Sequence, residues 1–480
     1  MTLRPSLLHR SLLLAPALVV ATGCVSHRKE VSALVSTYEA GRFADAAAQI
    51  DADGYQDGLE SDTNGIRFQL EAAKVLQDAG RYAESRDMFE RASAGLEAWD
   101  MEADVSISEE VVATLGSQTS RPYRGTEFDR ILLEVYQTFN YLALGDLDEA
   151  LVRVRRAYRR QAEAVARNGA EIAAREESDN EVAKGALQQT DFLQLEAETK
   201  TLASESYADF VNPVATFLQA VLLREEGTNP SALVELRKLI GLVPSNGYLP
   251  VLYEEFDASE APVPGRVYVL FENGMAPQRI EWSLVLPTPN GITRIAVPKL
   301  EPTPIAVAAL RVSDPSGELD LVTQRLASVD SIVAADFAAR LPGIVFRTML
   351  SVAAKEGISY AARKNDDTGL AWLATDLYRL FTSDADLRTW RTIGAEFQLA
   401  YGQVPESGVL RIGYVSPGGP DSGTVEIEVP PARTTFILVR NPRLSPILPH
   451  VLSIGRSANL PPRPEPTSAP EPTPETQPDA

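Results

Sequence analysis

The sequence contains very little cysteine and histidine. Its 480 residues include one Cys and three His. One Cys cannot form an intrachain disulfide or a metal site with several thiolate ligands, and three His leave little scope for imidazole-based catalysis. The chain also has neither a Gly-x-x-x-x-Gly-Lys-Ser/Thr loop nor a Gly-x-Ser-x-Gly turn. We therefore predict no metal site, no cofactor and no catalytic residue, and hence a protein that is not an enzyme.

The sequence contains fewer basic than acidic residues. The chain has 45 Lys and Arg against 66 Asp and Glu, which gives a formal net charge of −21. A nucleic-acid-binding protein usually carries a basic surface, so this balance argues against a nucleic-acid partner. The length suggests two or three domains with sizeable cores, and a hydrophobic content of 44% is typical of globular proteins.

Long apolar runs are scarce as well. The run Ser11–Ala21 follows a short positively charged region and is shorter than the roughly 20 residues of a transmembrane helix, which is typical of a secretory signal peptide. The run ends in Ala21-Thr22-Gly23-Cys24, which resembles the lipobox of bacterial lipoproteins. The resemblance implies that residues 1–23 are removed and that Cys24 carries the lipid, including palmitate. The alternatives are an ordinary signal peptide followed by a chance Cys and a buried apolar Cys.

The residue after Cys24 is Val25. In Gram-negative lipoproteins an Asp at this position favours retention in the inner membrane. The resemblance therefore implies a lipid-anchored protein of the cell envelope, at the outer membrane and facing the periplasm. Several acyl chains would make this anchor durable.

Residues 24–255 have helical periodicity that is interrupted by similar glycine turns. A Gly, a spacer, an aromatic residue or Leu, an acid and a small residue recur between apolar helical segments, and a further helix pair is expected around Gly227. Such turns resemble those between the helices of tetratricopeptide repeats, although a generic helical bundle is the alternative. The three clearest examples are Gly41–Ala46, Gly80–Ser85 and Gly145–Ala150.

Residues 263–442 have a different pattern. Alternating apolar residues predict two groups of strands, and a helical insertion is expected at about 330–382. Pro342 sits where a second helix of this insertion would begin. The predicted fold class is therefore α+β, with an all-α tetratricopeptide-like domain followed by a β-sandwich-like domain. Residues 461–480 are rich in Pro and acids, which predicts a disordered tail.

Two groups of residues are candidates for binding. Arg153, Arg156 and Arg160 share one face of a predicted helix and could bind an anionic ligand, but an ion-paired face is the interpretation we favour in so acidic a chain. The second group could bind a glycan through carboxylates beside an aromatic ring, or could simply form a turn with its own ion pair. This group consists of Asp384, Asp386, Arg388 and Trp390.

Several stretches occur in an order that resembles a family of uncharacterised bacterial lipoproteins with tetratricopeptide-like N-terminal regions. The resemblance covers about residues 35–440 and implies an envelope protein without an established activity. The stretches include Tyr123–Arg130, Tyr141–Asp146, Asn212–Phe217, Phe271–Pro277, Val297–Leu300 and Asp386–Arg391.

These observations favour a lipid-anchored scaffold or adaptor that binds another envelope protein, because stacked helix pairs usually supply a surface for a partner. One alternative is a glycan-binding or glycan-active envelope protein. Another is an accessory subunit of an export or surface-assembly system.

Overall fold

The computed structural model of the chain describes most of the sequence between Val31 and Gly455. The predicted signal peptide, Cys24, Asp384 and the predicted tail lie outside the described residues. The described ranges are 31–102, 121–178, 181–204, 207, 210–288, 291–364, 385–416 and 422–455.

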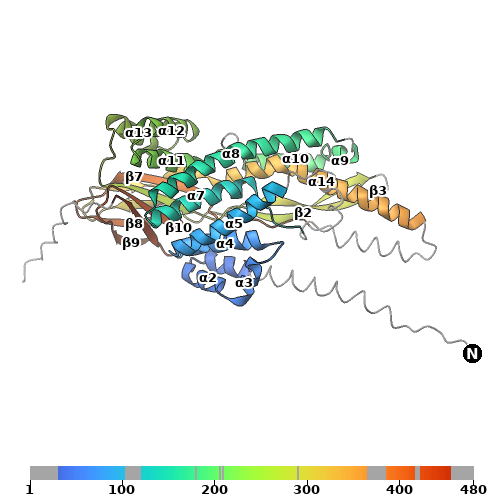
Figure 1. The fold of residues 1–480 in the computed structure, drawn as a ribbon, viewed down its shortest axis with the longest axis horizontal. Coiled ribbons are helices and arrows are strands. Elements are labelled where there is room, and N and C mark those ends of the chain that lie inside the picture. The colour runs from blue at the N-terminus through green and yellow to red at the C-terminus, as the bar shows by residue number, and fades with distance from the viewer. Residues whose placement is uncertain are drawn as a thin grey trace, which may run out of the picture.

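The N-terminal half is helical, as the periodicity predicts. A helix over residues 31–39 precedes the others, and neighbouring helices run side by side in Figure 1. None of the helices in the described ranges is long and apolar enough to cross a membrane. In chain order they are α2 (Phe43–Ile50), α3 (Asp53–Leu59), α4 (Gly65–Asp78), α5 (Tyr82–Glu102), α7 (Glu127–Ala143), α8 (Leu147–Glu176), α9 (Glu181–Ala186), α10 (Thr190–Leu202), α11 (Pro213–Glu225), α12 (Asn229–Leu242) and α13 (Tyr248–Ala258).

Glycine turns join the helices of four pairs. Gly41, Gly80, Gly145 and Gly227 have φ angles of 72°, 78°, 79° and 88°, in the left-handed region that disfavours side chains. Each turn closes with the same two backbone hydrogen bonds, illustrated by Gly80 N–H to Gln77 O (2.9 Å) and by the following N–H to Leu76 O (2.8 Å). This is the Schellman arrangement that satisfies the last carbonyls of a helix. The four predicted helix pairs are confirmed.

The second half contains three sheets. A five-stranded sheet has the order β11-β10-β1-β7-β6, a hairpin pairs β2 with β3, and a four-stranded sheet has the order β5-β4-β8-β9. The chain is therefore α+β, as predicted. The strands are β1 (Arg266–Asn273), β2 (Gln278–Thr288), β3 (Gly291–Glu301), β4 (Ala309–Ser313), β5 (Asp320–Val322), β6 (Gln324–Ser328), β7 (Glu396–Gln403), β8 (Val409–Val415), β9 (Ser422–Glu428), β10 (Thr434–Asn441) and β11 (Pro449–Ile454).

The five-stranded sheet is the middle layer of the molecule. On β1, Val267 and Val269 pack toward the four-stranded sheet, whereas Tyr268 and Leu270 pack toward the helices. Side chains alternate across a strand, so both faces of this sheet are buried. One hydrophobic core runs from α4 and α7 to strand β11, which lies beyond the predicted boundary at residue 442. Helices and sheet therefore share a core.

A lobe at the end of the molecule joins β2 and β3 to α9, α10 and α14 (Val329–Lys364). The expectation of a new helix at Pro342 is wrong, because α14 continues through this residue. Proline removes the hydrogen bond to the carbonyl of Ala338. The apolar contacts of Leu341 and Val345 on either side outweigh that loss.

Candidate functional site

Two opposite charges lie on the helical face of the central sheet. Glu272 of β1 and Arg440 of β10 are direct partners in a parallel strand pair. Each follows by two residues a leucine that packs toward the helices, namely Leu270 and Leu438. Both charged side chains are buried, and Arg440 Nε lies 3.7 Å from Glu272 Oε1. Buried charges need partners, and the helices supply them.

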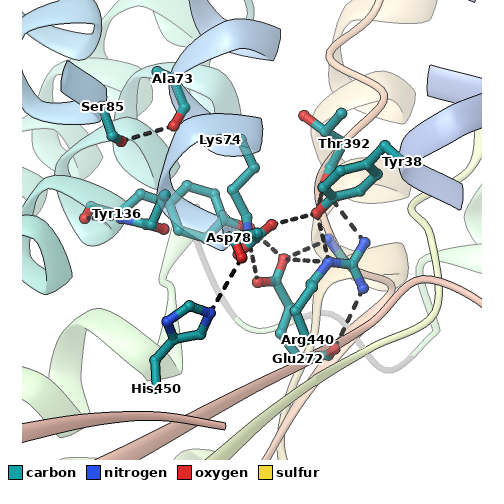
Figure 2. A network of polar contacts seen from close by, with 12 residues as sticks. Tyr38, Ala73, Lys74, Asp78, Ser85, Tyr136, Glu272, Thr392, Arg440 and His450 are labelled. Carbon is teal, nitrogen blue, oxygen red and sulfur yellow. Dashed lines mark hydrogen bonds and ion pairs between the residues drawn. The ribbon is translucent and has the colours of Figure 1, made fainter. Parts of the chain in front are cut away.

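Helix α4 supplies a second pair of opposite charges. Lys74 Nζ donates to Asp78 Oδ1 at 2.6 Å and Oδ2 at 2.5 Å, one helical turn away. The same ammonium lies 3.0 Å from Glu272 Oε2, so Lys74 bridges the helix and the sheet. Figure 2 shows the four side chains converging from α4, β1 and β10. Two cations and two anions give a cluster with no net charge.

Two tyrosine hydroxyls complete this cluster. Tyr38 donates to Asp78 Oδ2 at 2.5 Å and accepts from Arg440 Nε at 2.8 Å. Tyr136 of α7 donates to Glu272 Oε1 at 2.6 Å. We call Tyr38, Lys74, Asp78, Tyr136, Glu272 and Arg440 the interface network. Its members come from three helices and two strands, so it fastens the helical layer to the sheet.

The pKa values reflect these contacts. Burial alone would raise the pKa of Glu272, but the charges of Lys74 and Arg440 outweigh burial and lower it. Burial alone would lower the pKa of Arg440. Its anionic and hydroxyl neighbours have the larger effect, so the pKa is raised. Burial raises the pKa of Tyr38 and of Tyr136 well above the usual value. The network is therefore charged but its tyrosines are neutral at neutral pH.

A cavity of about 30 Å³ lies against the network, which is room for one or two water molecules. Its lining includes Tyr82, Tyr136, Glu272, Arg440 and His450. His450 Nε2 lies 3.1 Å from the carbonyl oxygen of Asp78, and burial lowers the pKa of the imidazole. The cavity is too small for an organic substrate, so this geometry favours attachment of the layers over chemistry.

An irregular segment, residues 385–395, runs between the helices and the sheet, and we call it the strap. Glu71 of α4 holds the strap by its backbone. The carboxylate accepts the N–H of Arg391 at 2.8 Å and the N–H and hydroxyl of Thr392 at 3.0 and 2.8 Å. Burial raises the pKa of Glu71, and these hydrogen bonds oppose the rise. The helices thus bind an extended segment of their own chain.

Three of the predicted binding residues are part of the strap. Trp390 is 1% exposed, its ring centroid lies 5.9 Å from that of Phe89 and 5.5 Å from that of Tyr136, and its Nε1 donates to Thr392 Oγ1 at 3.0 Å. The ring is a core side chain without a free face for a sugar.

Asp386 and Arg388 form a bidentate ion pair, with both nitrogen–oxygen distances 2.8 Å. Burial alone would raise the pKa of Asp386, but Arg388 lowers it. Arg388 Nη1 also donates to the carbonyl oxygens of Thr63 (3.2 Å) and Arg121 (2.8 Å), which ties the strap to the segments before α4 and α7. Asp384, the fourth residue of the predicted group, is outside the described residues.

The arginines of α8 face the acids of α5 and α7. Arg153 Nη2 lies 2.7 Å from Glu90 Oε1, and Arg160 Nη2 lies 2.9 Å from Glu97 Oε1. Arg156 pairs with Glu97 and, through Nε at 2.9 Å, with Glu134. The structure brings the three predicted arginines together, but their charges are met by carboxylates of the same chain. Binding of an anionic ligand stays a prediction.

One stretch of the family resemblance has a structural role. Thr126 begins α7, and its hydroxyl accepts the N–H of Asp129 at 3.0 Å while Asp129 Oδ2 accepts the N–H of Thr126 at 2.6 Å. Tyr123 donates to the same Asp129 oxygen at 2.7 Å. This reciprocal capping fixes the start of the helix that carries Tyr136.

None of the six residues of the interface network was predicted as a site residue. Lys74 and Asp78 lie four residues apart and flank the apolar pair Val75-Leu76, a pattern that could have indicated an ion pair on a helix. Arg440 follows the apolar run of a strand and carries no comparable local signal. Among the described residues, no group of three or more His, Cys, Asp or Glu could hold a metal ion.

Comparison with protein-family profiles, with curated proteins and with solved structures finds no match to this chain.

Proposed function

We propose that the protein is a lipid-anchored scaffold or adaptor of the bacterial cell envelope. In this proposal Cys24 carries the lipid, the protein faces the periplasm from the outer membrane, and another envelope protein is the partner. The helical half is tetratricopeptide-like and the strand half is β-sandwich-like. The proposal assigns no catalytic activity to either half.

The main support is that the helices bind the strap, an extended segment of the same chain. The strap lies against α4, α5 and α7, and Glu71 recognises its backbone while Phe89 and Tyr136 enclose its Trp390. Grooves between paired helices are a common way to recognise peptides. The four glycine turns repeat one backbone geometry along the chain, which agrees with a repeat architecture.

The strap also limits where a partner could bind. The inward side of α4, α5, α7 and α11 is covered by the strap and the central sheet, because these elements share one core. A partner would therefore dock on the outer side of the helices. Exposed apolar side chains there include Val152 on α8 and Val234 on α12, each 47% exposed.

Site-specific photo-crosslinking in native envelopes tests the scaffold. A photoreactive residue at Val152 or Val234 should yield a discrete adduct with one envelope protein. Thr424 of strand β9, which is exposed on the opposite side of the molecule, is the matched control. Adducts at Thr424 alone would assign partner binding to the strand half, and no adduct at any of the three positions would contradict a scaffold.

The anchor has a separate test. Cys24→Ser should release the protein from the membrane fraction and abolish incorporation of labelled fatty acid. A Cys24→Ser protein that still fractionates with membranes in high salt would contradict lipid attachment at this residue.

A further inference from the structure

Two proline-containing loops carry exposed apolar side chains at one end of the central sheet. One loop, residues 302–308, precedes β4, and the other, residues 442–448, connects β10 to β11. Three of the ten large apolar side chains that are exposed in the described residues lie on these loops. They are Leu444 (67% exposed), Leu448 (45%) and Ile305 (38%). Loops usually present polar residues, so this concentration calls for an explanation.

Side-chain amides hold the two loops together. Asn273 Nδ2 donates to the carbonyl oxygen of Val307 at 2.8 Å, and Asn441 Nδ2 donates to Asn273 Oδ1 at 3.1 Å. Asn441 Oδ1 accepts the N–H of Ser445 at 3.1 Å. These hydrogen bonds link β1 and β10 to both loops. All of the bonded groups are buried and therefore shielded from water. The exposed leucines therefore project from a fixed base.

The loop 442–448 lies beside the first helix pair of the described chain. Gly41 packs directly on Ser445, so closely that a side chain at residue 41 would collide with it. Arg443 Nη2 lies 3.1 Å from Glu39 Oε2. The described helix begins at Val31, seven residues after Cys24, and those residues span at most about 25 Å when extended. The loops are therefore within reach of a membrane to which Cys24 is attached.

We propose that these two loops rest on the lipid surface that holds the anchor. Leu444, Leu448 and Ile305 would enter the boundary between headgroups and acyl chains, and the exposed guanidinium of Arg443 would stay at the level of the phosphates. The inference rests on the proposed lipid anchor and adds an orientation to it. The anchor alone does not set which part of the protein faces the bilayer, whereas a second contact does.

Single-cysteine labelling of the full-length lipidated protein tests the contact. Acylation consumes Cys24, so Leu444→Cys or Leu448→Cys would provide the only free thiol for an environment-sensitive fluorophore. The proteins are reconstituted in vesicles of phosphatidylethanolamine and phosphatidylglycerol, with and without lipids that carry a quencher in the acyl chain. Val251→Cys is the control, because Val251 is also exposed (52%) but belongs to α13, which lies on the other side of the helical layer from α2 in Figure 1.

Lipid contact predicts a blue-shifted emission that acyl-chain quenchers reduce at residues 444 and 448 but not at 251. Equal, unquenched emission at all three positions in protein that floats with the vesicles would overturn the contact and leave the anchor intact. A blue shift that appears only in native envelopes, without lipid quenching, would assign the loops to a protein partner instead. Protein that fails to float with the vesicles would contradict the anchor, and the contact with it.

Discussion

Replacing Lys74 by methionine removes the ammonium that bridges α4 and β1 but keeps a side chain of similar length. Lys74 is buried, and its Nζ contacts the carboxylates of Asp78 and Glu272. In the variant only the guanidinium of Arg440 remains to compensate two buried carboxylates. Removing one partner from a buried ion pair costs about 3–5 kcal/mol, because the remaining charge is left without compensation. We expect Lys74→Met to lower the free energy of unfolding by this amount.

Urea unfolding of the full chain, followed by circular dichroism, measures the loss. Lys200→Met is the matched control, because Lys200 is 62% exposed and pairs with Glu196 one helical turn away. Such surface pairs contribute about 0.3–0.5 kcal/mol. A double variant, Lys74→Met with Glu272→Gln, restores the balance of charges and should be more stable than the sum of the two single losses implies. If Lys74→Met behaves like Lys200→Met, the network contributes nothing and the reasoning fails.

The pH dependence gives a second check on the same variant. In the wild type the pKa of Glu272 is lowered, so its contribution to stability is present above the unfolded pKa of about 4.3 and is lost as the pH falls below it. Without Lys74, burial should raise this pKa, and the carboxyl would take up a proton before the protein unfolds. The difference in stability between wild type and variant should therefore be largest near about pH 8 and shrink toward about pH 4.

Three further predictions concern other parts of the fold and are tested by urea unfolding. Gly145 has a φ of 79° and no atom close by, so Gly145→Ala should lower the free energy of unfolding by about 1–2 kcal/mol through backbone strain alone. Gly169→Ala within α8 is the control and should raise it by about 0.5–1 kcal/mol. Equal effects of the two substitutions would contradict a left-handed turn at Gly145. Arg224→Met should lower the free energy of unfolding by at least about 3 kcal/mol, because the buried guanidinium donates to three carbonyl oxygens between residues 256 and 261. A loss below about 1 kcal/mol would contradict this role. Burial and the charge of Glu396 raise the pKa of Asp330 to about 7. The folded state therefore loses stability as the pH rises from the unfolded pKa of about 3.9 to about 7, and the loss is complete above that range. Asp330→Asn should then be more stable than wild type by roughly 2–4 kcal/mol near about pH 8 and show no gain near about pH 4, and a gain independent of pH would contradict the shift.

The helical half could be predicted largely from the sequence because its signals are local. A glycine turn such as Gly80-Arg81-Tyr82 needs only neighbouring residues to close its hydrogen bonds. The same holds for α7, whose apolar stripe and Thr126 cap lie within one segment. Prediction from local sequence was wrong at Pro342. Proline tends to end or begin a helix, but the packing of the lobe around α14 keeps this helix continuous.

The interface network could not be predicted in this way because it depends on distant strand register. Tyr38 and Arg440 are 402 residues apart in the chain but share a hydrogen bond. Arg440 faces Glu272 only because β10 pairs with β1 in parallel, with a whole domain of sequence between them. Strand β11 was missed for a different reason, since a short edge strand has few residues to show an alternating pattern.

Candidate residues chosen for their chemistry proved hard to separate from residues that hold the fold. Trp390 and Arg388 looked like parts of a polar, aromatic-flanked loop, and the structure places both against the helices. An aromatic residue beside charged residues is consistent with a ligand site and equally with a segment buried between two layers. The distinction depends on exposure, and the sequence of an irregular segment carries no periodicity from which exposure can be inferred.

The core that helices and sheet share determines how the proposed scaffold function can be tested. Deleting the helical half would expose the helical face of the central sheet, including Tyr268 and Phe436. It would also leave Glu272 without Lys74 and Arg440 without Tyr38. The strand half would then lose much of its buried apolar area as well as its charge balance. Loss of a partner in a deletion variant would therefore report misfolding as readily as a missing docking surface. Only substitutions of exposed residues, made one at a time in the full chain, separate partner binding from the integrity of the fold.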